Sequence, residues 1–459
     1  MSPQCVILFR AMALPPEHPS RPSVQTVRWM FRPIEYLDDA SERLGETFGV
    51  KFAGFSTPLY FTSDPAAAKA VYGNARNTLP PGRGTTLEPV MGSRSILLLE
   101  GSEHLARRKL MLPPFHGDRM RAYESVIEEV SRREVDAWPL GEDFRVHPRM
   151  QSVTLEVILR AVFGVTDPGR LARMREALGV LLRQTASPAM QLIGFATQRF
   201  GRYGPWGRFE QNLARVDERI YEEIAARRAD PDLDDREDIL SMLLVARFED
   251  GSEMSEKELR DQLVTLLLAG HETTATALAW TFDLLLRNPE QLDRLRAEIV
   301  EAQDDAYLRA VITESLRLRP VIPIAGRRLA EDTELDGYTL PAGTDVSPSI
   351  YLTHMRPDLY PEPRSFKPER FLEDGPETYS WIPFGGGVRR CLGAAFAEFE
   401  MRVVLREVLG RCRLQAASDR PEGIKHRNIT LSPKRGTPLR VLERTAAAPR
   451  PVVSSSASA

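Results

Sequence analysis

Cys391 stands in the ten-residue stretch "FGGGVRRCLG", which combines glycines, arginines and a single thiol. The glycines at 385–387 would let the backbone wrap closely around a flat object, and Gly393 leaves open the space just past the sulfur. The sequence after Cys391 predicts a strong helix, so the thiol lies at a helix N-terminus, where the dipole and free amides stabilise a thiolate. Arg389 supplies positive charge nearby. These residue types favour a thiolate that binds a soft metal, with an anionic cofactor group paired to arginine.

Two other interpretations of this stretch can be weighed from the sequence. A single cysteine is more often an ordinary buried thiol, and the glycines and the helix dipole argue against that here. A phosphate-binding loop is excluded, because neither GKS nor GKT follows and the GxGxxG spacing is absent. The three cysteines of the chain, Cys5, Cys391 and Cys412, form no CxxC pair and no disulfide framework, and so fit a reducing compartment.

A second group of reactive side chains, His271, Glu272 and Thr273, interrupts the apolar run "LVTLLLAGHETTATALAW". A buried carboxylic acid beside an alcohol can deliver protons to a ligand, because burial shifts the carboxyl pKa toward proton exchange. Gly270 would let that ligand come close. The alternative is a local kink, in which a threonine hydroxyl bonds to a carbonyl one turn earlier. A zinc protease helix is excluded, because HExxH requires histidine where Ala275 stands.

The helix that carries this group must pass through the core, since its middle is apolar on nearly every face. A capping box at Ser255 and Glu258 begins it, and Asn288 and Pro289 end it after Arg287. The fold class is mainly α with small β-sheets. Further helices are predicted around 103–112, 120–137, 154–163, 168–184 and 208–228, and short strands within 49–63 and 333–347.

The composition of the 459-residue chain predicts an ordered globular protein, with 42% hydrophobic and 27% charged residues. A formal net charge of −3 gives no general attraction to nucleic acid. The apolar run near the start is far shorter than the roughly 20 residues of a membrane span, and it lacks the flanks of a signal peptide. We therefore expect a cytoplasmic protein without a membrane span.

The spacing of Phe384, Gly387, Arg389, Cys391 and Gly393 resembles the haem-binding signature of the cytochrome P-450 superfamily, the haem-thiolate monooxygenases. Other motifs match in the family's order. Four residues of the predicted central helix resemble its oxygen-activation motif: Ala269, Gly270, Glu272 and Thr273. Three further residues resemble its buried ion network: Glu314 and Arg317 of the ExxR helix, and Arg370 of "PERF". Taken alone, Glu314 and Arg317 could be an i,i+3 surface pair that stabilises a helix by about 0.2–0.5 kcal/mol. The resemblance therefore rests on the occurrence of all these motifs together, in the family's order.

A third group supplies positive charge. His104 and Arg108, in "SEHLARRKL", fall one helical turn apart and share a face. The resemblance implies that they bind haem propionates together with Arg327, of "GRRLAED", and Arg389. A solvated basic face is the alternative, and is the better interpretation of Arg107 and Lys109.

The resemblance covers residues from about 15 to 442, without departure at the key positions; Glu272 stands where many relatives have aspartate. It implies the cytochrome P-450 fold, with haem b (iron protoporphyrin IX) between the central helix and the helix after the cysteine loop, and Cys391 as the metal ligand. We expect a proline-rich segment at 1–22, one catalytic domain at 23–443 and a disordered tail at 444–459.

The implied reaction is hydroxylation or epoxidation with O2, in which Thr273 hydrogen-bonds the bound dioxygen and Glu272 relays protons. Because the chain shows no flavin or nicotinamide module, electrons would come from NAD(P)H through a ferredoxin reductase and a ferredoxin, with the protein a monomer. Candidate docking residues are Arg107, Lys109, Arg390, Arg402 and Arg406. Two alternatives stay open: a peroxide-using or peroxide-rearranging haem-thiolate enzyme, which often lacks the acid–alcohol pair, and a non-enzymatic haem sensor.

The substrate pocket implied by the resemblance is apolar, which indicates a lipophilic substrate. The stretch "LMLPPFHGDRM" resembles bacterial members that oxidise fatty acids or terpenoid-like molecules. The predicted lining is Leu97, Leu98, Ile193, Phe195, Leu267, Val321, Ile322, Ile324 and Leu431.

Overall fold

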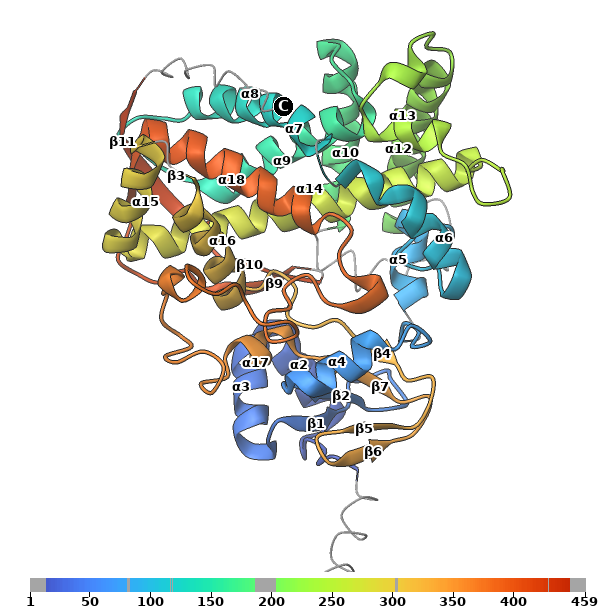
Figure 1. Ribbon diagram of the computed structural model, residues 1–459, viewed down its shortest axis with the longest axis vertical. Helices are drawn as coiled ribbons and strands as arrows, with labels where there is room; N and C mark the ends of the chain where they lie inside the picture. The colour runs from blue at the N-terminus through green and yellow to red at the C-terminus, as the bar shows by residue number, and fades with distance from the viewer. Residues whose placement is uncertain are drawn as a thin grey trace, which may run out of the picture.

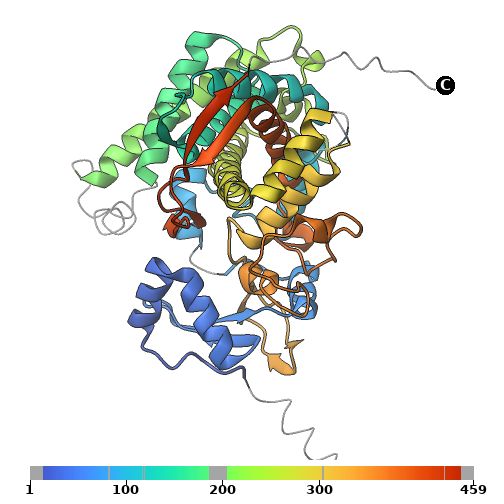
Figure 2. The same cartoon turned by 90° about the vertical axis from the view of Figure 1, so that its left-hand side faces the viewer.

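The computed structural model describes residues 14–80, 83–115, 117, 119–185, 204–301, 304–427 and 429–445. Figure 1 shows a large helical part crossed by α14, above a smaller part that holds α2, α3 and the sheet of β1, β2, β7 and β4. In Figure 2, α14 is seen nearly end-on with other helices around it. The mainly α class with small sheets is confirmed.

Helices make up most of the described chain, and short strands connect or flank them. The helices are α2 Pro22–Phe31, α3 Pro33–Leu44, α4 Pro65–Gly73, α5 Arg83–Met91, α6 Gly101–Met111, α7 Arg119–Ala122, α8 Glu124–Asp136, α9 Val146–Phe163, α10 Pro168–Thr185, α12 Pro205–Arg228, α13 Ile239–Val245, α14 Glu256–Arg287, α15 Pro289–Glu301, α16 Ala306–Leu318, α17 Ile350–His354 and α18 Ala394–Arg411, with the short turns η4 Pro368–Phe371 and η5 Gly387–Arg389. The strands are β1 Thr47–Val50, β2 Leu59–Thr62, β3 Asp143–Arg145, β4 Arg327–Arg328, β5 Thr333–Leu335, β6 Tyr338–Leu340, β7 Asp345–Pro348, β8 Cys412–Ala416, β9 Ile424–Arg427, β10 Thr430–Pro433 and β11 Pro438–Arg444.

The central helix α14 has the predicted bounds. Ser255 Oγ accepts from Glu258 N, and Glu258 Oε2 accepts from Ser255 N at 3.0 Å, so both bonds of the capping box form. Most of the helix is buried, and it packs along α9. The local start signal and the apolar run together position the His271–Thr273 group inside the protein.

Other elements differ from the prediction in detail. The helix predicted at 120–137 is divided at Tyr123, whose hydroxyl donates to the Glu237 carbonyl at 3.1 Å, and the helix predicted at 154–163 already begins at Val146. The two predicted strand regions meet, because β2 pairs in parallel with β7, with Leu59 opposite Asp345. Within the part of the chain that the structure describes, every helix is too short or too polar to span a bilayer.

Glu400 is an acid of α18 that lies 2% exposed in the core. Its Oε1 has no hydrogen-bond partner among the described residues, and burial raises the pKa of its carboxyl well above the ordinary value. The folded protein therefore keeps a proton that the unfolded chain loses above about pH 4.5, so this residue costs stability as pH rises.

Glu400→Gln should stabilise the protein by about 1–3 kcal/mol at pH 8 and by little at pH 5, because glutamine stays neutral at both. Urea unfolding at the two pH values measures the difference. Glu443→Gln is the control, since Glu443 is exposed on β11. A stabilisation that is the same at both pH values would contradict the prediction.

Candidate functional site

The loop that carries Cys391 lies between η5 and α18 and is closed by backbone hydrogen bonds. Cys391 N donates to the Phe384 carbonyl at 2.9 Å, and Arg390 N donates to the Gly387 carbonyl at 3.0 Å. Gly387 has φ +63°, and a Cβ there would collide with the carbonyl of Tyr72 in α4. This glycine is therefore required for packing on α4, and the predicted wrapping of the loop around a ligand stays a prediction. Nothing lies within 4 Å of a Cβ built at Gly393, in line with the expected open space beyond the sulfur.

The Cys391 thiol keeps accessible surface although burial is the largest influence on its pKa. Burial raises the pKa of the thiol, while the Gly393 amide and the charges of Arg390 and Arg108 act in the opposite direction. Arg389, the cation predicted near the thiol, donates from Nη2 to the Leu99 carbonyl at 2.6 Å.

The four basic residues of the third group come together around His104. Burial, together with the positive charges of Arg389, Arg108 and Arg327, lowers the pKa of His104 to about 4. His104 is therefore neutral at pH 7 and lies close to three arginines. A site of this kind fits a ligand with two carboxylates, as haem propionates are.

The middle of α14 is where this buried helix exposes surface. Ala269 is exposed, and Gly270 and Thr273 are half-buried. Thr273 Oγ1 donates to the Ala269 carbonyl at 2.5 Å. This is the hydrogen bond expected if the polar group only kinks the helix, yet α14 continues to Arg287. A Cβ at Gly270 would stand 3.0 Å from Ile158 Cδ1 of α9. The absence of a side chain at Gly270 therefore allows α9 to pack closely, and the predicted approach of a ligand stays a prediction.

The Glu272 carboxyl points toward α9 and β9. Gln151 Nε2 donates to Oε2 at 2.6 Å, and Arg427 Nη1 lies 3.2 Å from Oε1. His147 Nε2 lies 3.7 Å from Oε1, but burial lowers the His147 pKa to about 3, so that ring is neutral. Burial raises the pKa of Glu272, and Arg427, Gln151 and the exposed Lys425 oppose that shift. No sequence motif indicated these partners, since they lie more than a hundred residues from Glu272 along the chain.

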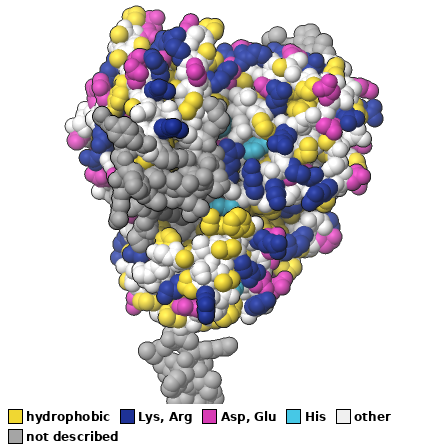
Figure 3. All heavy atoms as spheres, turned by 180° about the vertical axis from the view of Figure 1, so that it is seen from behind, with side chains coloured by type: hydrophobic (Ala, Val, Ile, Leu, Met, Phe, Trp, Pro, Cys, Tyr) yellow, Lys and Arg dark blue, Asp and Glu magenta, His cyan; other side chains and the backbone are white. Residues whose placement is uncertain are grey.

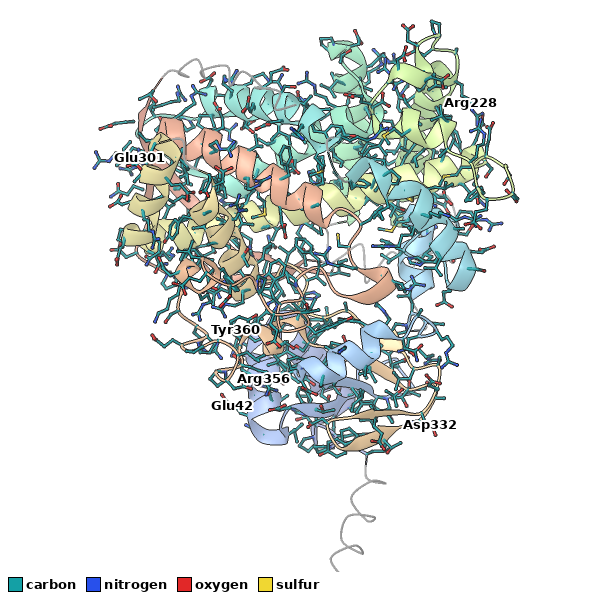
Figure 4. The ribbon with its side chains drawn as sticks, viewed as in Figure 1. Glu42, Arg228, Glu301, Asp332, Arg356 and Tyr360 are labelled. Atoms are coloured by element: carbon teal, nitrogen blue, oxygen red, sulfur yellow. The ribbon has the colours of Figure 1, made fainter. Side chains whose placement is uncertain are left out.

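Glu314 and Arg317 form a fully buried ion pair on α16. Arg317 Nε and Nη2 contact the two Glu314 oxygens at 2.6 and 2.8 Å, and Arg370 Nε of η4 lies 3.3 Å from Oε1. The Arg317 guanidinium also stacks over the Tyr360 ring at 5.0 Å from its centroid. Figure 4 labels Tyr360 between the helical part and the lower sheet. The network therefore joins α16 of the helical part to the segment that runs from His354 to Arg370.

His354 extends this network to the loop, and no sequence motif indicated it. Its Nε2 accepts from Ile382 N at 2.9 Å, so Nδ1 carries the proton and donates to the Arg317 carbonyl at 3.1 Å. Burial lowers the His354 pKa to about 3, which keeps the ring in this neutral form. His354 therefore holds Ile382, two residues before Phe384, against α16.

The predicted pocket residues lie in two groups. Leu97 is 41% exposed and Leu98 half-buried, in a segment held on α14 by a 3.0 Å hydrogen bond from Ile96 N to Gln262 Oε1. In the second group, Leu431 N donates to the Val321 carbonyl at 2.7 Å. Leu267, Val321 and Leu431 are buried, whereas Ile322 and Ile324 are half-buried. Ile193 and Phe195 lie outside the described residues.

A family model described as cytochrome P-450 matches residues 15–440 of the chain. The chain belongs to the cytochrome P-450 family. Members are haem-thiolate monooxygenases, so this protein is an oxidoreductase that uses haem iron. The prediction of the family from its motifs is confirmed.

Relatives agree with this assignment over nearly the whole cytochrome P-450 chain. The protein named cytochrome P-450 135B1 of Mycobacterium tuberculosis is 42% identical over 443 residues, 94% of this chain and 92% of that protein. Cytochrome P-450 137 of the same organism is 41% identical over 379 residues, 82% of this chain and 79% of that protein.

Solved structures share the fold. The haem domain of cytochrome P-450DA superposes with a TM-score of 0.83 at 24% identity, over 95% of this chain and 99% of that one. The cyanobacterial CYP120A1, solved with retinoic acid, gives 0.79 at 23% identity, over 94% and 99%.

Proposed function

We propose that this cytochrome P-450 hydroxylates or epoxidises a lipophilic small molecule, with Cys391 as the haem ligand and a ferredoxin-type protein as the electron donor. The accessible Cys391 thiol beside Arg108, with His104 and its arginines close by, carries the proposal. His104, Arg108, Arg327 and Arg389 would hold the haem propionates. The haem supplies an iron centre that activates O2, with electron density donated by the thiolate.

Glu272 and Thr273 would move protons on the α14 side. Burial raises the pKa of the Glu272 carboxyl, which favours proton exchange, and Arg427 and Lys425 of β9 lie on its outer side. Because the Thr273 hydroxyl donates to the Ala269 carbonyl, its oxygen can accept a hydrogen bond from water or from the reacting group.

The exposed Leu97 and half-buried Leu98 support a lipophilic substrate of the fatty acid or terpenoid class. Electrons would come from NAD(P)H through a reductase and a ferredoxin to a cytoplasmic monomer. Among the candidate docking residues, Arg390 is exposed, whereas Arg107 pairs with Glu258 at 2.5 Å and Arg406 with Asp305 and Glu124. We therefore assign docking to the surface around Arg390 and not to Arg107 or Arg406.

The absorption spectrum of the reduced protein with carbon monoxide tests the proposal. A strongly red-shifted Soret band is expected from a thiolate ligand. A band typical of histidine-ligated haem, or no haem at all, would overturn the assignment of Cys391. Turnover with a surrogate ferredoxin and reductase then separates an enzyme from a haem sensor.

Thr273→Ala should keep the haem content but divert electrons from product to peroxide or water, lowering product per NAD(P)H about tenfold. Product and peroxide are measured per NAD(P)H consumed. Thr281→Ala is the matched control, because Thr281 Oγ1 makes the same bond to a carbonyl one turn earlier, that of Ala277, at 2.9 Å. Unchanged coupling in Thr273→Ala would exclude the role of this hydroxyl.

A further inference from the structure

Tyr72, near the end of α4, is buried between several parts of the candidate site. Only 2% of its surface is exposed. Figure 1 shows α4 below the orange segment that leads into α18, with β4 and β7 beside it. On the opposite face of the molecule, Figure 3 shows basic, acidic and hydrophobic side chains interspersed over the described residues, as on an ordinary solvated surface. The contacts of Tyr72 in the interior are more specific.

The first set of contacts joins Tyr72 to the cysteine loop. A Cβ built at Gly386 would stand 2.8 Å from Tyr72 Cδ2, and one at Gly387 would collide with the Tyr72 carbonyl. Both the ring and the main chain of Tyr72 therefore pack directly on the loop that leads to Cys391. Because that loop is closed by the backbone bond from Cys391 N to the Phe384 carbonyl, the place of Tyr72 also fixes the place of the loop.

The second set of contacts joins Tyr72 to the strand that carries Arg327. The Tyr72 hydroxyl donates to the Ala325 carbonyl at 3.0 Å, and Thr78 exchanges backbone hydrogen bonds of 3.0 and 2.8 Å with Arg328. Arg327 stands between these attachments and is 6% exposed, and its guanidinium carbon lies 5.0 Å from the centroid of the Tyr72 ring. A guanidinium that stacks on a ring donates within its own plane, so this contact sets the direction of its N–H groups.

We propose that Tyr72 is a positioning residue for the haem, because its side chain holds the Arg327 guanidinium at a fixed place relative to the Cys391 sulfur. The inference rests on the proposed function, in which Cys391 binds the iron and Arg327 a propionate. Haem is a rigid ring whose iron and propionates lie at set distances from each other. A side chain that packs on both the cysteine loop and the arginine therefore relates the two contacts to one cofactor. A tyrosine that only fills the core would contribute stability alone.

The rate at which haem leaves the full, haem-loaded chain for excess apomyoglobin tests this role. Tyr72→Met should release haem about tenfold faster, because methionine fills the space but cannot stack as a ring does. Tyr72→Phe keeps the ring and should stay within about threefold of the parent. The matched control is Tyr36→Met, since Tyr36 of α3 is fully buried, with the Arg28 guanidinium 5.4 Å from its ring centroid and its hydroxyl bound to Gln25 Oε1. That variant should lose comparable stability in urea but release haem at the parental rate.

Equal acceleration of haem release in Tyr36→Met and Tyr72→Met would assign the effect to lost stability and overturn the proposal. So would an acceleration of about a hundredfold in Tyr72→Met/Arg327→Met when each single variant gives about tenfold, because side chains that act through one contact are not additive. Arg327→Lys keeps the charge but not the planar group, and should release haem about fivefold faster without any change at Tyr72. A parental rate in that variant would also overturn the proposal.

The carbon monoxide spectrum of the parent separates this inference from the proposed function. A parent without the red-shifted band would remove Cys391 as the iron ligand. A parent with that band, together with a parental rate of haem release in Tyr72→Met, would reject the positioning role alone.

Discussion

Glu314→Gln should lower the free energy of unfolding by about 3–5 kcal/mol, because it leaves the Arg317 guanidinium charged in the core without its carboxylate. Both side chains have no exposed surface, and Arg317 shares two hydrogen bonds with Glu314. The same carboxylate accepts from Lys367 N at 2.9 Å and contacts Arg370, so the chain at 367–370 would also lose its attachment to α16.

Urea unfolding of the purified variant measures this loss. Glu222→Gln is the matched control, since Arg219 and Glu222 form an i,i+3 pair at 2.6 Å on the exposed side of α12 and its loss should not be measurable. The double variant Glu314→Gln/Arg317→Met should recover part of the stability, because it removes the buried charge. If Glu314→Gln were as stable as Glu222→Gln, the network would not hold the segment from His354 to Arg370 on α16.

The sequence was sufficient for features whose cause is local. The capping box and apolar run of α14 lie within one segment, so both its bounds and its burial could be predicted. The division of the 120–137 helix could not, because it coincides with a contact between Tyr123 and Glu237, more than a hundred residues away. The parallel pairing of β2 with β7 is likewise a long-range event that neither strand signals alone.

The candidate site shows the same limit. The spacing of the sequence identified the motif residues, but it did not identify the side chains that contact them and shift their pKa values. Gln151 and Arg427 reach Glu272 from α9 and β9, and His354 of α17 binds Ile382, just before the cysteine loop. Gly387 could be recognised as a special position, yet only the structure assigns its clearance to Tyr72. Residue type and spacing therefore predicted which positions belong to the candidate site, whereas contacts with distant parts of the chain determine the surroundings of each.

Cys391→Ser should abolish the red-shifted carbon monoxide band and lower turnover by about a thousandfold or more, because a serine hydroxyl is not deprotonated as a thiolate is. The fold should survive, since the loop is closed through the backbone bond from Cys391 N to the Phe384 carbonyl, which needs no sulfur. Urea unfolding measures that survival independently of turnover.

The matched control is Cys412→Ser, which changes the other described cysteine, a fully buried thiol at the start of β8. That variant should lose some stability, because a polar group replaces sulfur in the core, but should keep the red-shifted band. A Cys391→Ser protein that retained the band would show that the thiolate comes from elsewhere. If instead both variants lost the band in proportion to their loss of stability, unfolding rather than ligation would be the cause. Only a loss of the band in a stable Cys391→Ser protein assigns the iron ligand to this sulfur.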